Sequence, residues 1–293
     1  MPACVCSRAQ IFTILMLCMV GFSQVGCSTN PATGKRQFNI LSEAEEIKIG
    51  SDGAPQFVKT YGGRVSDQRI LNYVTSLGKK LAASSERPDL PWSFEVVDSG
   101  ILNAFALPGG KVFISRGLMI RMTNEAQLAA VLGHEIGHVT AQHIGQQMSR
   151  QKLIVAGAGV LQGAAGATVG ESWSKWAGVI GGAGGKLYLL KFGRDQESQS
   201  DSLGLRYMTK HGYDPQGMIQ LMEILAAAGG GGMEILQTHP LSETRIQRIK
   251  SEIRERYAHT QGSNQFSLHA DRFQPILAAL KRLPRPRHPT QQQ

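Results

Sequence analysis

The stretch His134-Glu135-Ile136-Gly137-His138 places two histidines four residues apart in a segment with helical periodicity. Successive residues of an α-helix are rotated by about 100°, so side chains four residues apart lie nearly above one another. Both imidazoles can therefore hold one metal ion, and Glu135 can reach a water molecule bound to that metal. Two histidine ligands beside a carboxylate base are typical of zinc hydrolases. The stretch predicts a zinc site on a helix.

The residues around this motif predict that the helix is buried. Asn124 and Gln127 have the spacing of a capping box, and Glu125 suits the first turn of a helix. Apolar residues then recur at helical spacing, namely Leu128, Val131, Leu132, Ile136 and Val139. The alternative is a core helix whose histidines only make hydrogen bonds, which is disfavoured because burying two histidines beside a glutamate is costly.

The third metal ligand is expected from a second helix further along the chain, because His143 lies off the ligand face. Glu197 and Asp201 are a downstream acidic pair with helical spacing. Glu197 would complete a site of two histidines and one glutamate, with water in the fourth position. Asp201, one turn later, could accept the ring N–H of a ligand histidine. A solvated acidic face is the alternative interpretation, and two weaker candidates without a partner aspartate are Glu171 and Glu223.

These stretches resemble a known family of zinc metallopeptidases. The motifs HEIGHVTAQH, GRDQESQSD and THP (238–240) are similar to those of the family that includes the type-1 CAAX prenyl endopeptidase and the HtpX heat-shock peptidase, peptidase family M48. CSTNPATGKRQFNILS, which starts at Cys27, and RPDLPWSFEVVDSGILNAFALPGG, which starts at Arg87, resemble its bacterial lipoprotein branch. The resemblance implies an α+β fold, with a mainly helical gluzincin-type core, a small antiparallel sheet and an edge-strand hairpin.

The resemblance also implies a role for each residue of the predicted site. His134 and His138 match the two histidine ligands of one zinc ion per chain, and Glu197 matches the third ligand. Glu135 matches the general base. Asp201 matches the acidic residue that contacts a metal ligand without binding the metal itself.

His239, in the THP motif, is placed near the zinc by the same resemblance. It could donate a hydrogen bond to the developing oxyanion, or bind the metal as a fourth ligand and inhibit the enzyme. A helix-capping loop with an exposed histidine is the third interpretation. Asn103-Ala104-Phe105 resembles the edge strand that pairs with the substrate backbone in gluzincin peptidases, by β-strand addition. The alternative is that Asn103 is only a polar residue at a strand end.

The amino-terminal residues predict export and a lipid anchor. The four cysteines all fall within the first 27 positions, at Cys4, Cys6, Cys18 and Cys27. The apolar run 11–22 is too short to span a bilayer comfortably and fits a signal peptide over residues 1–26. The sequence before Cys27 resembles a bacterial lipobox, with Gln24 where leucine is usual, and Ser28 is similar to an outer-membrane sorting signal. We expect a protein lipidated at Cys27 on the periplasmic face of a Gram-negative outer membrane.

The remaining chain is expected to form one metallopeptidase domain, over residues 42–270. Residues 27–41 are expected to be an extended lipidated linker. A lid rich in glycine and alanine, or alternatively a plain connector, is expected over residues 153–186. A basic, proline-rich and partly disordered tail is expected over residues 271–293.

Periodicity predicts the elements that precede the zinc motif. Ser42 and Glu45 have the spacing of a capping box for the first of two helices within residues 42–86. The second helix has an apolar stripe formed by Ile70, Val74, Leu77 and Leu81. The predicted strands of the small sheet are Ser93–Val97, Asn103–Leu107 and Lys111–Ser115, and the last two form a hairpin. The stretch Tyr213-Asp214-Pro215 is expected to open a later amphipathic helix.

The formal net charge of +9 permits binding to nucleic acid or to anionic lipid. Because no nucleic-acid-binding motif accompanies the charge, attraction to membrane headgroups is the expectation. The sequence as a whole predicts a zinc endopeptidase that cleaves unfolded or outer-membrane proteins in protein quality control. The alternative is a chaperone-like lipoprotein that binds substrates on the same fold without cleaving them, and such a binder would have no need of Glu135.

Overall fold

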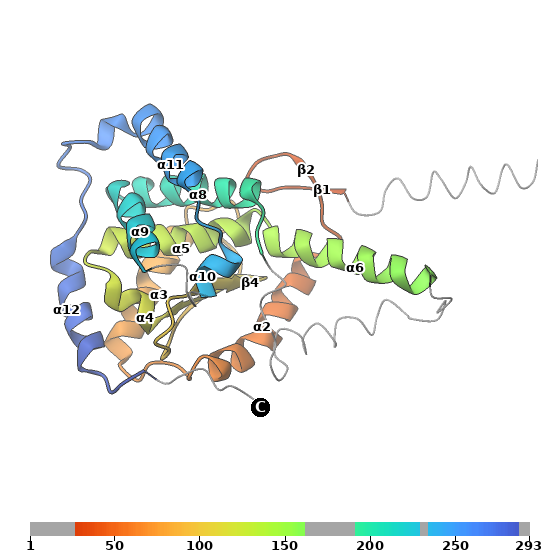
Figure 1. The fold of residues 1–293 in the computed structure, drawn as a ribbon, viewed down its shortest axis with the longest axis horizontal. Helices are drawn as coiled ribbons and strands as arrows, with labels where there is room; N and C mark the ends of the chain where they lie inside the picture. Colours follow the sequence, from red (N-terminus) through yellow and green to blue (C-terminus); the bar gives the residue numbers. More distant parts are fainter. Residues whose placement is uncertain (1–26, 162–190, 229–233, 287–293) are drawn as a thin grey trace, which may run out of the picture.

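The computed structural model describes residues 27–161, 191–228 and 234–286 of the 293-residue chain (Figure 1). The expected signal peptide, most of the expected lid and the end of the expected tail lie outside the described residues, as does Glu171. Within these ranges, no helix is long and apolar enough to cross a membrane.

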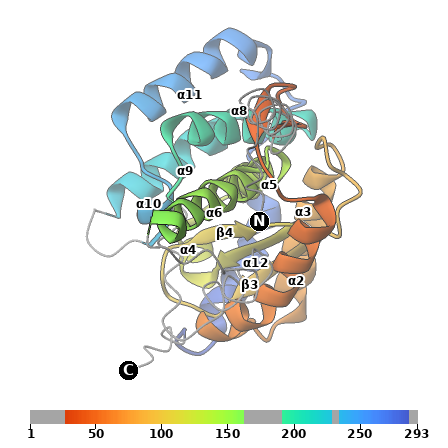
Figure 2. The same ribbon diagram turned by 90° about the vertical axis from the view of Figure 1, so that its right-hand side faces the viewer.

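A three-stranded sheet forms the layer on which the zinc-motif helix lies (Figures 1 and 2). Its strands are β3 (Ser93–Val97), β4 (Ala104–Leu107) and β5 (Lys111–Ser115), in the order β3-β5-β4. The expected hairpin of β4 and β5 is confirmed, and Gly109 and Gly110 take the positive φ values of its turn. β3 runs parallel to β5, so the sheet is mixed, and the expectation of an antiparallel sheet is wrong for this pair. The reason is that β5 inserts between the other two strands, which alternating hydrophobicity cannot specify.

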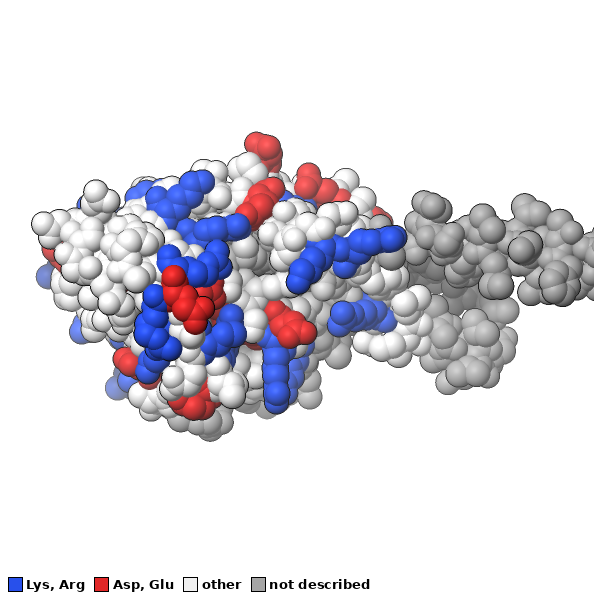
Figure 3. Space-filling model, turned by 90° about the horizontal axis from the view of Figure 1, so that it is seen from above, with Lys and Arg blue, Asp and Glu red and all other residues white. Residues whose placement is uncertain are grey.

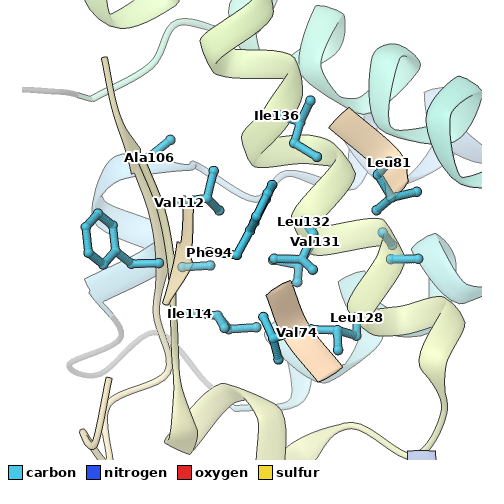
Figure 4. Close-up of a cluster of buried hydrophobic side chains, with 14 of the residues drawn as sticks. Val74, Leu81, Phe94, Ala106, Val112, Ile114, Leu128, Val131, Leu132 and Ile136 are labelled. Atoms are coloured by element: carbon cyan, nitrogen blue, oxygen red, sulfur yellow. The ribbon is translucent and has the colours of Figure 1, made fainter. Parts of the chain in front are cut away.

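Helices cover both faces of this sheet. On one face, Ala106, Val112 and Ile114 point toward α3 (Gln68–Ala82) and α5 (Glu125–Thr140), where they meet the apolar stripes of both helices (Figure 4). On the other face, Phe105 and Phe113 contact Phe57 of α2 (Glu43–Thr60), with ring centroids 3.7 and 5.3 Å from it. The predicted capping box of Ser42 and Glu45 is present at the start of α2.

Every residue of α5 is buried, because a second helix layer covers the side of α5 that faces away from the sheet. This layer contains α8 (Arg194–Lys210), α9 (Gln216–Ala227) and α11 (Glu243–Arg256) (Figure 2). A Cβ atom on Gly133 would lie 3.1 Å from Cα of Gly204, and one on Gly137 would lie 3.1 Å from Cα of Ser200. Small residues therefore set the close approach of α5 to α8.

The two segments that flank the expected domain are folded onto it. Where a linker was expected, β1 (Cys27–Thr29) and β2 (Arg36–Phe38) form an antiparallel hairpin beside α6 (His143–Leu161) (Figure 1). Where the tail was expected to begin, α12 (Ala270–Arg282) buries Phe273 and Leu280. The other short elements are α4 (Arg116–Arg121), α10 (Glu234–Thr238) and the 3-10 helix η3 (Ala258–Thr260).

Candidate metal centre

Four buried side chains converge on one point between α5, α8 and the loop after α10. They are His134, His138, Glu197 and His239, and one ligand atom from each lies within 4.8 Å of all the others. His134 Nε2 lies 3.0 Å from His138 Nε2 and 3.3 Å from His239 Nδ1. Glu197 Oε1 lies 2.9 Å from His239 Nδ1 and 3.3 Å from His138 Nε2.

This set fits a zinc ion by chemistry and by size. Imidazole nitrogen and carboxylate oxygen are the donors that zinc takes, at about 2.0–2.2 Å. Four ligands at that distance in a tetrahedron are separated by roughly 3.3–3.5 Å. Four of the six ligand pairs have spacings of 2.9–3.3 Å, which differ from that value by a few tenths of an ångström, and all six lie within 4.8 Å.

Capping by Asn124 explains where α5 begins. The side chain of Asn124 accepts a hydrogen bond from the backbone N–H of Gln127, as a capping residue does. In the first turn, Glu125 accepts hydrogen bonds from the hydroxyls of Tyr73 and Tyr213, at 2.5 and 2.7 Å. These contacts fix the start of the helix whose third and fourth turns carry the two histidines.

Glu135 lies next to the cluster and is 1% exposed. Its Oε1 lies 3.7 Å from His239 Nε2, and no described residue donates a hydrogen bond to that oxygen. Burial raises the pKa of Glu135, because a carboxylate loses its hydration in the interior. A carboxylate with one free oxygen and a raised pKa is suited to accept a proton from a substrate water.

A second layer of side chains holds two of the candidate ligands. Asp201 Oδ1 lies 3.0 Å from His134 Nδ1, the ring nitrogen that faces away from the cluster. Arg245 donates from Nε and Nη2 to the two oxygens of Asp201, at 2.8 and 2.7 Å, and its Nη1 lies 2.6 Å from Glu197 Oε2. One guanidinium therefore joins both carboxylates. The sequence analysis assigned no role to Arg245, although a cation six residues after His239 at the start of a helix was a usable signal.

Two further residues contact His138, and neither contact was predicted from the sequence. His143 is off the ligand face, as expected, but its Nδ1 lies 3.0 Å from His138 Nδ1. The ring of Phe192 lies over His138, with centroids 3.9 Å apart, and the backbone N–H of Phe192 donates to Thr238 O at 3.0 Å. The chain before α8 thus covers one ligand and pairs with the residue before His239.

The charges of the cluster are strongly coupled. Burial favours the neutral imidazole of His239, but the carboxylates of Glu197 and Glu135 outweigh burial and raise its pKa. Burial would raise the pKa of Glu197, yet attraction to His239 and His134 holds it well below the usual range. Burial lowers the pKa of His138 well below that of a free imidazole. The metal-free site therefore favours ionised Glu197 and neutral His138.

The other site residues expected from the sequence lie outside the ligand cluster. Asn103 and Ala104 are buried at the start of β4, which pairs only with β5 among the described strands and so has one edge without a strand partner there. Glu223 is exposed on α9, away from the cluster. Cys27 is the first described residue, at the start of β1.

The family model and the relatives found by comparison with known proteins are all metallopeptidases or proteases. The model of peptidase family M48 matches residues 70–253. The chain is 31% identical over 246 residues to the beta-barrel assembly-enhancing protease of Yersinia pestis, which covers 82% of this chain and 50% of that protein. For the protein of that name in Escherichia coli (strain K12), identity is 31% over 228 residues, 74% of this chain and 46% of the relative. The mitochondrial metalloendopeptidase OMA1 of Schizosaccharomyces pombe is 31% identical over 225 residues, 75% of this chain and 64% of the relative. The chain spans about half the length of the beta-barrel assembly-enhancing proteases that it matches.

Proposed function

The chain belongs to peptidase family M48, and on that premise we propose that it is a zinc-dependent endopeptidase of the bacterial cell envelope. The observation that carries the proposal is the convergence of His134, His138 and Glu197 on one point, with the carboxylate of Glu135 beside it. Those three side chains would hold the zinc ion. When bound, zinc polarises the scissile carbonyl and acidifies the attacking water.

Glu135 would serve as the general base. It takes a proton from the attacking water and later delivers that proton to the leaving amine. The pKa of Glu135 is raised towards neutral pH, and both proton transfers are most efficient when the pKa of the base lies near the working pH. Asp201 would hold the ring of His134 in place, and Arg245 would hold the carboxylates of Asp201 and Glu197. Neither residue would touch the substrate.

His239 would act as a fourth ligand in the resting enzyme. Its Nδ1 lies among the other ligand atoms, while its Nε2 faces Glu135 Oε1 at 3.7 Å. In this arrangement His239 takes the position of the reactive water and occupies the base, so it opposes turnover. Movement of the loop after Thr238 would free the position of the reactive water and the carboxylate of Glu135. A donor to the oxyanion is the alternative role of the same side chain.

The free edge of β4 would bind the substrate backbone. Asn103 and Ala104 lie at the start of this strand, and α5 packs against it. An extended peptide that adds to a strand edge gains main-chain hydrogen bonds with little sequence selectivity. This mode suits unfolded polypeptides, and the name of the Yersinia and Escherichia relatives connects those proteins with beta-barrel assembly.

The cellular setting is proposed from the same relatives and from the lipobox. A lipid chain on Cys27 would anchor the protein to the periplasmic face of the outer membrane, where misfolded outer-membrane proteins would be its substrates. A chaperone-like binder without proteolysis is the second candidate. It is disfavoured because it leaves the buried carboxylate of Glu135 without a purpose that would compensate the cost of burial.

The substitution Glu135→Gln tests the proposal directly. Glu135 is not a proposed ligand, so the variant should keep one zinc ion per chain while cleavage of an unfolded protein falls by roughly 10²–10⁴-fold. Zinc content by atomic absorption and cleavage of reduced casein are measured together, and the matched control is Glu223→Gln, at an exposed position of α9. Proteolysis by Glu135→Gln at the rate of the control would reject the mechanism, and wild-type protein without zinc would reject the metal site.

A further inference from the structure

The amino-terminal hairpin is hydrogen-bonded to the junction between α5 and α6. Asn30 Nδ2 donates to the backbone oxygen of Ala141 at 3.1 Å, in a buried contact. Gln37 Nε2 donates to Gln142 Oε1 at 2.6 Å, and Gln146 Nε2 donates back to Gln37 Oε1 at 2.8 Å. These bonds join parts of the chain more than 100 residues apart, immediately after the last turn of the helix that carries the zinc motif.

The junction itself has an unusual backbone conformation. α5 ends at Thr140 and α6 begins at His143, and Gln142 between them has a φ of 56°. Residues other than glycine rarely adopt this left-handed conformation, and they keep it where the surroundings hold them. Both ends of the Gln142 amide are held. Its Oε1 accepts from Gln37, and its Nε2 donates to Glu46 Oε1 at 3.2 Å.

Glu46 is in turn fixed to the end of α5. It lies 2.7 Å from Arg87 Nη2, and the two side chains are only 2% and 5% exposed. Arg87 Nη1 donates to the backbone oxygen of Val139 at 3.1 Å. Gln37 of the hairpin and Glu46 of α2 therefore both hold the turn between α5 and α6.

This turn places His143 behind the candidate ligand His138. Nδ1 of each ring lies 3.0 Å from Nδ1 of the other, and His143 Nε2 lies 3.0 Å from Gln199 Oε1. Because His138 Nε2 faces the ligand cluster, a neutral metal-binding imidazole must carry its proton on Nδ1. His143 Nδ1 then accepts a hydrogen bond from His138 Nδ1–H. His143 therefore carries its own proton on Nε2 and donates it to Gln199 Oε1. The contact fixes the tautomer of both rings.

We propose that the amino-terminal hairpin positions the metal centre: Gln37 and Glu46 hold Gln142 in its left-handed conformation, and this keeps His143 against His138. The inference rests on the proposed zinc site. Partners of this kind orient a ligating histidine and raise its basicity, and their loss weakens metal binding without removing a ligand. Gln37 is thus a positioning residue, although it lies at the opposite end of the sequence from Glu197 and His239.

The substitution Gln37→Ala in the full chain tests this link. We expect zinc affinity, measured by competition with a chelator, to fall on the order of 10-fold, the lower end of the range for lost ligand supports. The matched control is Arg36→Ala, which changes the exposed neighbouring residue on β2 and should leave the affinity unchanged. Wild-type protein that binds no zinc would contradict the proposed function. Equal zinc affinities in the wild type, Gln37→Ala and Arg36→Ala would contradict this inference alone.

A rescue variant separates positioning from a loss of stability. Glycine adopts the left-handed conformation without steric cost, so adding Gln142→Gly to Gln37→Ala should restore zinc affinity to within a few-fold of the wild type. If the hairpin only stabilised the fold, this second substitution would lower the unfolding temperature further and restore nothing. Failure of the restoration would therefore overturn the proposed route through the turn.

The histidine tautomers provide a readout that is independent of catalytic activity. In the zinc-loaded wild type, ¹⁵N spectra of the imidazoles should show His143 protonated on Nε2, and Gln37→Ala should mix the tautomers of His143. His143→Phe keeps a ring of similar shape without the acceptor, so it should weaken zinc binding as much as Gln37→Ala or more. This variant tests the link even if Gln37→Ala does not fold. Unchanged tautomers in Gln37→Ala, or unchanged zinc affinity in His143→Phe, would overturn the proposal.

Discussion

Arg245 contacts two carboxylates and one backbone carbonyl of the metal centre. Its guanidinium binds both oxygens of Asp201 and lies 2.6 Å from Glu197 Oε2, and its Nη1 lies 3.3 Å from the backbone oxygen of Pro240. Because it engages Oε2, it leaves Oε1 of Glu197 facing the imidazoles. A planar fork of five N–H donors can make these contacts together, whereas a lysine ammonium cannot.

Replacement of Arg245 should therefore weaken zinc binding although no ligand is removed. We expect Arg245→Lys to lower zinc affinity by about 10-fold and Arg245→Ala by about 100-fold, the range found for partners of metal ligands. Chelator competition measures the affinity. Arg256→Lys is the control, because that arginine lies on the same helix and is mostly exposed beside Glu252. Arg245→Lys with the affinity of this control would show that the bidentate contact is unimportant.

The pH dependence of zinc binding distinguishes the two roles of His239. A ligand imidazole must be neutral, and the carboxylates of Glu197 and Glu135 raise the pKa of His239 above 6.5 despite its burial. Protons should therefore compete with zinc at His239 as the pH falls through that raised pKa, starting above 6.5. Burial lowers the pKa of His138, so protons compete there only at more acidic pH.

We expect wild-type zinc affinity to decline from above pH 6.5, and His239→Ala to lose that part of the decline. The same variant should bind zinc slightly less tightly at high pH and cleave an unfolded protein faster, because the position of the reactive water is vacated. Affinity is measured by chelator competition at each pH. A slower variant with an unchanged pH profile of zinc binding would instead identify His239 as the oxyanion donor, with a loss of roughly 10²–10³-fold.

At the scale of elements, local signals predicted what lies within single helices and hairpins. The capping box of Ser42 and Glu45, the stripe of α3 and the hairpin of β4 and β5 each depend on residues close in sequence, and each is confirmed. At the start of α5 only half of the expected capping box forms, because Gln127 Oε1 accepts from the backbone N–H of Thr123 and not from that of Asn124. The parallel pairing of β3, the folded hairpin at Cys27–Phe38 and the docking of α12 depend on partners far along the chain. The same limit applies to the site, because contacts of Arg245 and His143 join separate elements, whereas helical spacing alone related His134 to His138.

The close packing of α5 on α8 provides a prediction at this scale. A Cβ at Gly137 would lie 3.1 Å from the backbone of Ser200, which cannot move alone, so Gly137→Ala should shift α8 and with it Glu197. We expect a loss of about 1–3 kcal/mol in the free energy of unfolding, as overpacking usually costs, together with weaker zinc binding. Urea denaturation and chelator competition measure both effects. Gly193→Ser, at a position with open space, is the control, and equal stability of the two variants would contradict the packing argument.

At the scale of the molecule, the proposed anchor lies on the hairpin that contacts the turn after the zinc-motif helix. Cys27 begins β1, the hairpin of β1 and β2 lies beside α6, and α6 follows the zinc-motif helix after a two-residue turn (Figure 1). No spacer separates Cys27 from the folded part, so a lipid there would hold the site close to the bilayer surface. On the face that carries α11, Lys and Arg side chains are interspersed with Asp and Glu (Figure 3). The positive charge on that face forms no continuous patch.

The substitution Cys27→Ala tests this arrangement in the cell. If Cys27 is the acylated first residue of the mature protein, the variant should remain uncleaved or lose its membrane attachment, because the basic surface alone binds anionic lipid weakly and reversibly at physiological salt. Fractionation with intact-mass spectrometry reports both the mature terminus and the attached lipid. Cys18→Ala, within the expected signal peptide, is the control and should be processed normally. A mature terminus at another residue, or Cys27→Ala that stays membrane-bound after cleavage and a high-salt wash, would contradict lipid anchoring, and the unusual Gln24 would explain why the lipobox is not used.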